Sequence, residues 1–284
     1  MALYRYTTPD ARCLHGTARN AVMSQSFQDS NNSTVTLAEG VNLDIAKCPH
    51  LLIAGTTGSG KSNVLHCIIA SLLLKNGPQQ AEFLIIDPKM VEFEYFYRNQ
   101  PCLYCPIVTD PEEALLRLEQ ASAEMMRRYE QNKAEGRRFW NGSRLYIVID
   151  EIADLVSAGG KRLEGVIEKI ARLGRGAGVH LICATQHPTA QVLSRQITTN
   201  LDVRICLRVR DGAASRLVLG HNGAEQLRGK GDAILQGTDG EMRFQAAYIC
   251  DDDLERFSHS WTLTPLEQIT DNTQYYNSDR KSVV

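Results

Sequence analysis

Two kinds of hydrophobic pattern alternate along this chain. In the first, four to eight consecutive positions are almost all apolar, which is typical of strands buried on both faces of a sheet. Strands are therefore expected at 50–54, 82–87, 145–150, 178–185 and 204–209, with an edge pair at 233–235 and 242–249. In the second, apolar positions are spaced so that roughly one face of a helix is apolar. Helices are expected at 61–75, from Asp110-Pro111 onward, and at 161–173. Strands separated by helices indicate an α/β fold, with a mostly parallel sheet covered by helices on both faces.

Both ends of the chain lack such patterns. Residues 1–33 are polar and weakly patterned and are interpreted as a flexible leader, and residues 259–284 as a polar tail. Between them, 34–258 is expected to form one domain. Its first element, TVTLAEGVNLDIA, predicts a short hairpin that turns at Glu39-Gly40.

The overall composition excludes few functions. The 284 residues are 43% hydrophobic and 23% charged, as in ordinary globular proteins. The net charge of −2 divides unevenly: residues 251–284 carry seven acidic and three basic side chains, a local −4, which leaves +2 for the first 250 residues. Neither value is the basic signature of a nucleic-acid-binding protein, so DNA binding would have to depend on local features.

Membrane and disulfide features are also missing from the sequence. The longest apolar run, Cys67–Leu74, is too short to cross a bilayer, and the N-terminus does not resemble a signal peptide. Cys102 and Cys105 form a single CxxC, without a second pair that would complete a zinc site. We expect a cytoplasmic chain whose eight cysteines are reduced thiols.

The segment GTTGSGKS, residues 55–62, matches the phosphate-binding pattern G-x-x-x-x-G-K-[ST] and lies between an expected strand and an expected helix. Its backbone N–H groups would surround the phosphates, and the helix N-terminus would add positive charge. Lys61 would contact the β- and γ-phosphates of ATP, and the Ser62 hydroxyl would bind Mg²⁺. The expected nucleotide-binding residues are Gly55, Thr56, Thr57, Gly58, Ser59, Gly60, Lys61, Ser62 and Asp150.

Asp150 and Glu151 supply the acidic half of such a site. Asp150 ends the apolar run LYIVID and would hold Mg²⁺ together with Ser62. Glu151 follows it and would act as the general base that polarises the attacking water. An acid favoured at a helix start would explain Glu151 alone, but not the pair together with the phosphate loop. Hydrolysis of ATP is therefore favoured over passive binding.

Asp87, Lys89 and Glu92 follow another expected strand, in IIDPKMVEF. Ligands of such folds bind at the carboxyl edge of the sheet, where these side chains should lie. Two interpretations stay open: neighbours of the active site, or charges on a solvated loop.

Several separated blocks make a more specific statement possible. In this order they resemble the FtsK/SpoIIIE family of DNA translocases, over about residues 41–236: PHLLIAGTTGSGKS, IIDPKMVEF, EMMRRYE, IVIDEIADL, RGAGVHLICATQHP and GAEQLRGKGDAIL. The resemblance implies a RecA-like P-loop NTPase domain that assembles into a ring, usually a hexamer. It also implies that double-stranded DNA passes through the central channel, driven by ATP hydrolysis at the subunit interfaces.

The resemblance assigns further roles. Gln186, in Ala-Thr-Gln, matches the family's polar sensor of the γ-phosphate. Arg204 falls where the family places an arginine that contacts the nucleotide of a neighbouring subunit, and Arg175 is its rival. Such an arginine would stabilise charge on the transferred phosphoryl group.

The sequence also departs from the family. His187 replaces the usual arginine of ATQRP, Cys102 stands where a histidine is frequent, and the segment between Glu130 and Leu145 is shortened. No membrane-spanning region precedes the motor blocks, and there is no room after Ile249 for a winged-helix domain. We therefore expect a bare motor, of the kind a mobile element or plasmid could encode, or one recruited by a partner protein.

Two groups of basic residues are candidates for phosphate contacts. Each carries a local charge of +3: Lys161, Arg162, Lys169, Arg172 and Arg175 with Glu164 and Glu168, and Arg204, Arg208, Arg210, Arg216, Arg228 and Lys230 with Asp202, Asp211 and Glu225. Binding of DNA through them would be salt-dependent and independent of base sequence. Solvated faces and subunit interfaces are the alternatives.

An ATP-driven translocase of double-stranded DNA is the leading interpretation. A protein-secretion ATPase and a conjugative or packaging coupling ATPase are the alternatives with similar chemistry. A nucleotide-binding structural subunit, without turnover, is the third.

Overall fold

Five parallel strands form the centre of the protein. They correspond to the predicted strands in which almost every position is apolar. The computed structural model describes residues 4–6, 32–77, 79–93, 102–238, 240–250, 253–254 and 263–265. Its main sheet has seven strands in the order β10-β9-β8-β4-β7-β6-β5. The strands from β8 to β5 are parallel, and β9 and β10 extend the sheet in antiparallel pairing.

The elements have the following bounds. The strands are β1 Tyr4–Tyr6, β2 Thr34–Ala38, β3 Val41–Asp44, β4 His50–Ala54, β5 Ala81–Ile86, β6 Arg144–Ile149, β7 Val179–Thr185, β8 Val203–Leu207, β9 Asp232–Gly237, β10 Gly240–Gln245 and β11 Leu263–Pro265. The helices are α3 Lys61–Lys75, α4 Pro111–Ala134, α5 Ile152–Leu173, α6 Arg195–Asn200 and α7 Gly212–Leu219, with short 3-10 turns η4 Gly174–Ala177 and η5 Ala224–Gln226.

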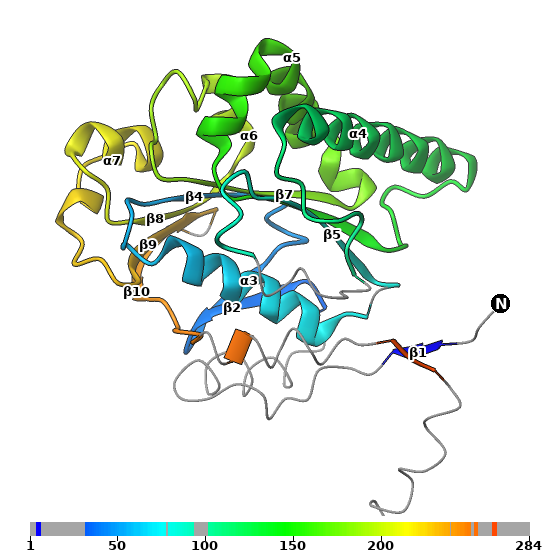
Figure 1. Ribbon diagram of the computed structural model, residues 1–284, viewed down its shortest axis with the longest axis horizontal. Coiled ribbons are helices and arrows are strands. Elements are labelled where there is room, and N and C mark those ends of the chain that lie inside the picture. The colour runs from blue at the N-terminus through cyan, green and yellow to red at the C-terminus, as the bar shows by residue number, and fades with distance from the viewer. Residues whose placement is uncertain are drawn as a thin grey trace, which may run out of the picture.

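Helices cover both faces of the sheet, which makes the fold the RecA-like α/β arrangement that was expected. One face packs against α3 and the hairpin β2–β3, and the other packs against α4 and α5 (Figure 1). Successive strand residues point to opposite faces, so Leu51 and Ile53 enter the core beside α3, whereas Leu52 and Ala54 enter the core beside α5. Burial on both faces explains why these strands are apolar throughout.

Local sequence signals account for most helix boundaries. The Asp110 carboxylate caps α4 by accepting a hydrogen bond from the Glu113 N–H, and Pro111 takes the first helical position. The helix expected at 161–173 is the second half of α5, which begins at Ile152. Gly160 separates the halves with a φ of 58°, a conformation that glycine adopts without the steric cost of a Cβ.

The edges of the fold agree with the expected pairings, with one change. The hairpin β2–β3 is antiparallel and turns through Gly40, which has a φ of 74°. At the sheet edge, β10 ends at Gln245, and residues 246–249 continue outside any strand. The segments expected as leader and tail contribute β1 and β11, which pair antiparallel. The boundaries at residues 33 and 258 stay a prediction.

Two further features bear on the sequence-based expectations. Across the described ranges, no helix combines the length and apolarity needed to span a bilayer. Within the same ranges every cysteine is a free thiol, and burial raises the pKa of Cys102 to about 12. In the described part of the chain, no group of three or more His, Cys, Asp or Glu side chains that could hold a metal ion surrounds the CxxC pair.

Candidate active site

The phosphate loop lies at the carboxyl end of β4, between the ends of β7 and β8. The Gly55 N–H donates to the carbonyl of Thr185 at the end of β7, and the Thr56 N–H donates to the carbonyl of Arg208 just after β8. Both contacts hold the loop at the sheet edge where parallel strands end together. This is the edge at which α/β proteins of this kind bind their ligands.

Glycine is required inside the loop for two different reasons. Gly58 has a φ of 75°, and nothing lies within 4 Å of the position that a Cβ would occupy, so only backbone strain opposes a substitution there. Gly60 has a φ of 104°, and its Cβ would also lie 2.6 Å from the backbone nitrogen of Gly231. The Gly231 N–H in turn donates to the Ser59 carbonyl over 2.7 Å. The segment 229–231 therefore packs directly behind the loop.

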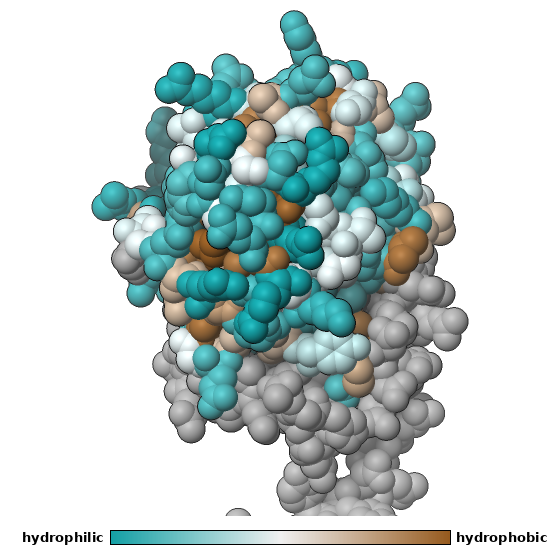
Figure 2. Space-filling model, turned by 90° about the vertical axis from the view of Figure 1, so that its left-hand side faces the viewer, coloured by the Kyte–Doolittle hydropathy of each residue, from teal (hydrophilic) through white to brown (hydrophobic). Residues whose placement is uncertain are grey.

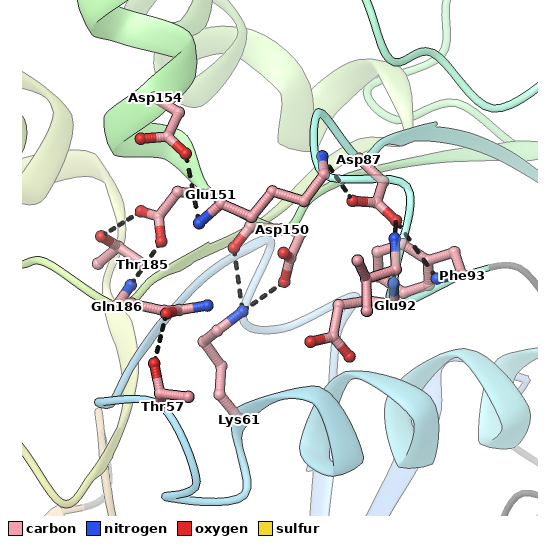
Figure 3. Close-up of polar contacts among 12 residues, drawn as sticks. Thr57, Lys61, Asp87, Glu92, Phe93, Asp150, Glu151, Asp154, Thr185 and Gln186 are labelled. Atoms are coloured by element: carbon pink, nitrogen blue, oxygen red, sulfur yellow. Dashed lines mark hydrogen bonds and ion pairs between the residues drawn. The ribbon is translucent and has the colours of Figure 1, made fainter.

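Lys61 and Asp150 form a buried ion pair, although 89 residues separate them in sequence. The Lys61 ammonium contacts one Asp150 carboxylate oxygen and also donates to the Asp150 carbonyl over 3.1 Å (Figure 3). Lys61 is 4% exposed and Asp150 is fully buried. Burial raises the pKa of Asp150, while the charge of Lys61 opposes this shift. The structure thus brings together the predicted phosphate-binding lysine and the predicted metal-binding carboxylate.

The donor set at this point fits Mg²⁺. The second carboxylate oxygen of Asp150 is buried and has no hydrogen-bond partner in the described chain. Ser62 follows Lys61 in the first turn of α3 and supplies a hydroxyl. A carboxylate and a hydroxyl are hard oxygen ligands, and Mg²⁺ usually takes only one or two such ligands from a protein, with water and phosphate completing its shell.

Glu151 is fully buried, and both of its carboxylate oxygens accept hydrogen bonds. One oxygen accepts from the Thr185 hydroxyl over 2.7 Å, and the other accepts from the Gln186 N–H over 2.9 Å. The Ala153 N–H adds a third, longer bond of 3.3 Å. Glu151 is also the N-cap of α5, so the alternative of an acid at a helix start describes its local contacts correctly. Its contacts to β7, however, orient the carboxylate beside the phosphate loop (Figure 3).

Gln186 connects Glu151 to the phosphate loop. Its backbone N–H bonds to Glu151, and its side-chain oxygen accepts from the Thr57 hydroxyl over 2.9 Å. The predicted sensor therefore lies where a change in the loop can be transmitted to the predicted base. Thr185 was not singled out from the sequence; its only signal there is its position beside Gln186 in Ala-Thr-Gln.

The Asp87 side chain binds the backbone of the loop that follows β5. Its buried carboxylate accepts hydrogen bonds from five successive backbone N–H groups, residues 89–93, and so closes the loop after β5. Lys89 forms an ion pair of 3.3 Å with Asp154 on α5. The charges of Glu92 and Asp87 contribute to raising the pKa of Asp150. Asp87 and Glu92 lie near the Lys61–Asp150 pair (Figure 3), whereas Met90 and Val91 of the same loop are exposed, so each of the two open interpretations describes part of this segment.

The guanidinium of Arg204 is bound within its own subunit. It donates to the backbone carbonyls of Val218 over 2.7 Å, Thr198 over 3.0 Å and Leu201 over 3.3 Å. These bonds join β8 to α6 and α7. A role in a neighbouring active site, which stays a prediction, would require some of them to break.

Arg175, the rival candidate, is exposed and lies in η4, which precedes β7. It therefore lies where the parallel strands begin, at the opposite end of the strands from the phosphate loop of its own chain. Its predicted contact with a neighbouring nucleotide is untested as well.

Both basic groups border hollows in the surface. Arg208, Arg210, Arg228 and Lys230 line a cavity of about 450 Å³ together with residues 56–59 of the phosphate loop. Lys169, Arg172 and Arg195 line one of about 880 Å³ between α5 and α6. The face that carries α7 and β10 is mainly hydrophilic, with apolar residues in small patches (Figure 2). Some of these charges are paired within the chain: Arg162 with Glu119, Arg210 with Asp211 and Arg228 with Asp232.

The fold and the loop geometry define the class of this protein as a P-loop NTPase with a RecA-like domain. Among solved structures, the conjugation coupling protein TcpA of pCW3, a monomer form with ATPγS, matches with a TM-score of 0.67 and 30% identity, over 77% of this chain and 66% of that one. The cytoplasmic domain of the type VII secretion ATPase EccC from Thermomonospora curvata matches with a TM-score of 0.63 and 27% identity, over 80% of this chain and 31% of that one.

Sequence comparison places the chain within that class: it belongs to the FtsK/SpoIIIE family, whose family model matches residues 19–144 and 134–190. The DNA translocase FtsK of Helicobacter pylori strain J99 is 41% identical over 84% of this chain and 31% of its own length. That of Pseudomonas aeruginosa is 36% identical over 85% of this chain and 35% of its own length. The chain thus spans about a third of these relatives.

Proposed function

We propose that this chain is an ATP-driven motor that moves double-stranded DNA through a ring of identical subunits. One observation carries the chemical half of the proposal: the buried pair Lys61–Asp150 stands beside a buried Glu151 whose carboxylate is held by hydrogen bonds from β7. A site for binding alone would not need the third charged group. The DNA half is supported by the similarity to DNA translocases over 84% of the chain.

In this proposal each group has one task. Lys61 binds the β- and γ-phosphates, and its bond to Asp150 keeps its ammonium at that end of the loop. Ser62 and the unpartnered oxygen of Asp150 would hold Mg²⁺, which when bound would supply positive charge to the phosphates. Glu151 accepts a proton from the attacking water, and Gln186 senses the γ-phosphate through its contacts to Thr57 and Glu151.

Movement of DNA requires phosphate contacts outside the nucleotide site. The two basic groups supply side chains for such contacts, and the second of them borders the phosphate loop itself. A change at the nucleotide could therefore be transmitted directly to a phosphate-binding surface. Since these contacts are ionic, binding of duplex DNA is expected to weaken steeply with salt. A cytoplasmic location, where ATP and DNA are found, is part of the proposal and agrees with the free thiols of the described residues.

The test is the rate of ATP hydrolysis with Mg²⁺ against the length of duplex DNA, beside electron micrographs with and without ATP. The rate is expected to rise with duplex length, and rings are expected in the micrographs. Glu151→Gln should lower kcat about 100-fold or more while ATP still binds. Glu112→Gln is the matched control, because Glu112 is an exposed acid in the first turn of another helix, α4. A chain that stays monomeric at high concentration with ATP and duplex present would refute the ring.

A second function is a protein-secretion or conjugative coupling ATPase. The observations that favour it are the similarities to TcpA and to the secretion ATPase EccC, at 30% and 27% identity. The same assay separates the proposals. An ATPase rate that does not respond to duplex of any length would support secretion and exclude the duplex-driven motor, whereas no turnover under any condition would indicate a structural nucleotide-binding subunit.

A further inference from the structure

The order of strands gives the bound triphosphate a direction. The phosphate loop follows β4, and the groups that face the γ-phosphate in the proposed function, Asp150 and Glu151, follow β6 on one side of β4. The α- and β-phosphates lie along the loop backbone, with the lysine toward the γ end. In this arrangement the nucleoside would leave the loop on the other side of β4, toward β8 and over the first turn of α3.

Residues 246–249 occupy that side, directly against the first turn of α3. The Asn63 side chain, one residue after Ser62, accepts from the Ile249 N–H over 2.9 Å and donates to the Ala247 carbonyl. The Ala246 N–H donates to the carbonyl of Gly231 over 2.8 Å, and Gly231 packs behind the phosphate loop. The segment is thus bonded to the loop and to its helix, although it lies more than 180 residues further along the chain.

Within this fixed segment Tyr248 points away from the protein core. Its neighbours Ala247 and Ile249 are buried, whereas Tyr248 is 65% exposed. The Asn63 side chain contacts the backbone on both sides of Tyr248, at Ala247 and at Ile249, and so holds the tyrosine in this orientation. A tyrosine combines a flat apolar ring with a polar hydroxyl, so on a fixed backbone it offers a stacking surface for a flat ligand. The fold therefore presents an aromatic ring where the nucleoside is expected.

We propose that Tyr248 is the stacking residue for the base of the bound nucleoside triphosphate. The inference rests on the proposed nucleotide binding at residues 55–62 and adds its base subsite. An aromatic ring stacks on the flat face of any base, and such contacts contribute to affinity without requiring hydrogen bonds to the base edge. Asn63 is then a positioning residue, because it orients the segment that carries the ring.

The experiment compares ATP with inorganic tripolyphosphate, which has the phosphates but no base, in calorimetric titrations with Mg²⁺. Tyr248→Ala should weaken ATP binding about 5- to 150-fold and leave tripolyphosphate binding unchanged. Tyr248→Phe should bind ATP like the parent, because the ring is retained. Phe139→Ala is the matched control, since Phe139 is another exposed aromatic residue, 50% exposed, on the segment after α4.

The outcomes separate this inference from the function on which it rests. If the parent binds neither ligand, and Lys61→Ala behaves identically, nucleotide binding itself fails. If the parent binds ATP and Tyr248→Ala binds it equally well, Tyr248 has no part in base binding, although the nucleotide site stands. Equal losses for ATP and tripolyphosphate would show that the tyrosine shapes the loop, and unchanged ATP binding with altered self-association would show that it contacts a second copy of the chain. Either result overturns the inference.

Discussion

The Thr185 hydroxyl lies 2.7 Å from a carboxylate oxygen of Glu151, and this hydrogen bond joins the end of β7 to the start of α5. It points the proposed base toward the phosphate loop rather than along its own helix. Thr185→Val keeps the shape of the side chain but removes the donor. We expect kcat to fall about tenfold or more with little change in KM, since a bond to a charged group contributes about 1.5–3 kcal/mol.

Thr185→Ser restores the hydroxyl and is expected to keep most of the activity. Thermal unfolding of both variants checks that the fold is retained. A parental kcat for Thr185→Val would show that Glu151 needs no orientation from β7.

The Lys61–Asp150 pair is expected to matter for stability as well as for nucleotide binding. Lys61→Met leaves a buried carboxylate without its partner, which destabilises by about 3–5 kcal/mol. Burial already raises the pKa of Asp150, and without Lys61 the pKa should rise further. An acid whose pKa is raised in the folded state contributes less stability as the pH rises. The loss of unfolding free energy caused by Lys61→Met should therefore be larger at pH 8 than at pH 5.

A double-mutant cycle compares Lys61→Met, Asp150→Asn and the variant that carries both changes. The free energy of unfolding of each is measured with denaturant. The double variant should be more stable than Lys61→Met alone, because the amide carries no charge. Strictly additive losses would contradict a coupled pair.

Arg204 can be tested by mixing two inactive proteins. Lys61→Ala lacks the phosphate lysine, and Arg204→Ala lacks the predicted trans arginine. If Arg204 acts on a neighbouring subunit, a mixed ring contains sites with an intact Lys61 from one chain and an intact Arg204 from the next. Mixing should then recover ATPase activity that neither variant has alone.

The same mixture with Arg175→Ala tests the rival residue. Arg204→Ala is also expected to unfold more easily, because its guanidinium donates to three carbonyls. Lost stability without recovery on mixing would leave Arg204 with a structural role only.

His50 and His180 make the fold sensitive to acid. Both are buried, and loss of hydration lowers the pKa of His50 to about 4 and that of His180 to about 3. Because their folded-state pKa values lie below the unfolded value, the stabilisation is present above about pH 6.5 and is lost as the pH falls toward 4. For His50 this corresponds to about 3 kcal/mol, at about 1.4 kcal/mol per pKa unit.

Unfolding free energies of the parent and of His180→Gln between pH 4 and 7 check this prediction. The variant should lose less stability than the parent over that range. His221→Gln is the control, because hydrogen bonds from its ring to the Asn222 carbonyl and to Glu241 raise the pKa of the exposed His221, so its effect has the opposite sign. Parallel pH curves for parent and His180→Gln would refute a role of the buried imidazole.

Much of the fold could be predicted because the signals are local. The apolar runs place β4 to β8 within a residue or two, since each strand is buried on both faces. The capping pair Asp110-Pro111 marks the start of α4, and the glycines with Lys61 and Ser62 mark the phosphate loop. In each case the residues that determine the structure are neighbours in sequence.

The tertiary structure alone decided the relations between distant segments. The strand order puts β4 between β7 and β8, brings Thr185 to Glu151 and places Tyr248 beside Asn63. It also binds the Arg204 guanidinium to carbonyls of its own chain and gives α5 an additional half before Gly160. The sequence by itself determined which chemistry is present, because motifs are local. Which side chains meet, and so which positions are occupied or free, depends on hydrogen bonds and packing between segments that only the folded chain brings together.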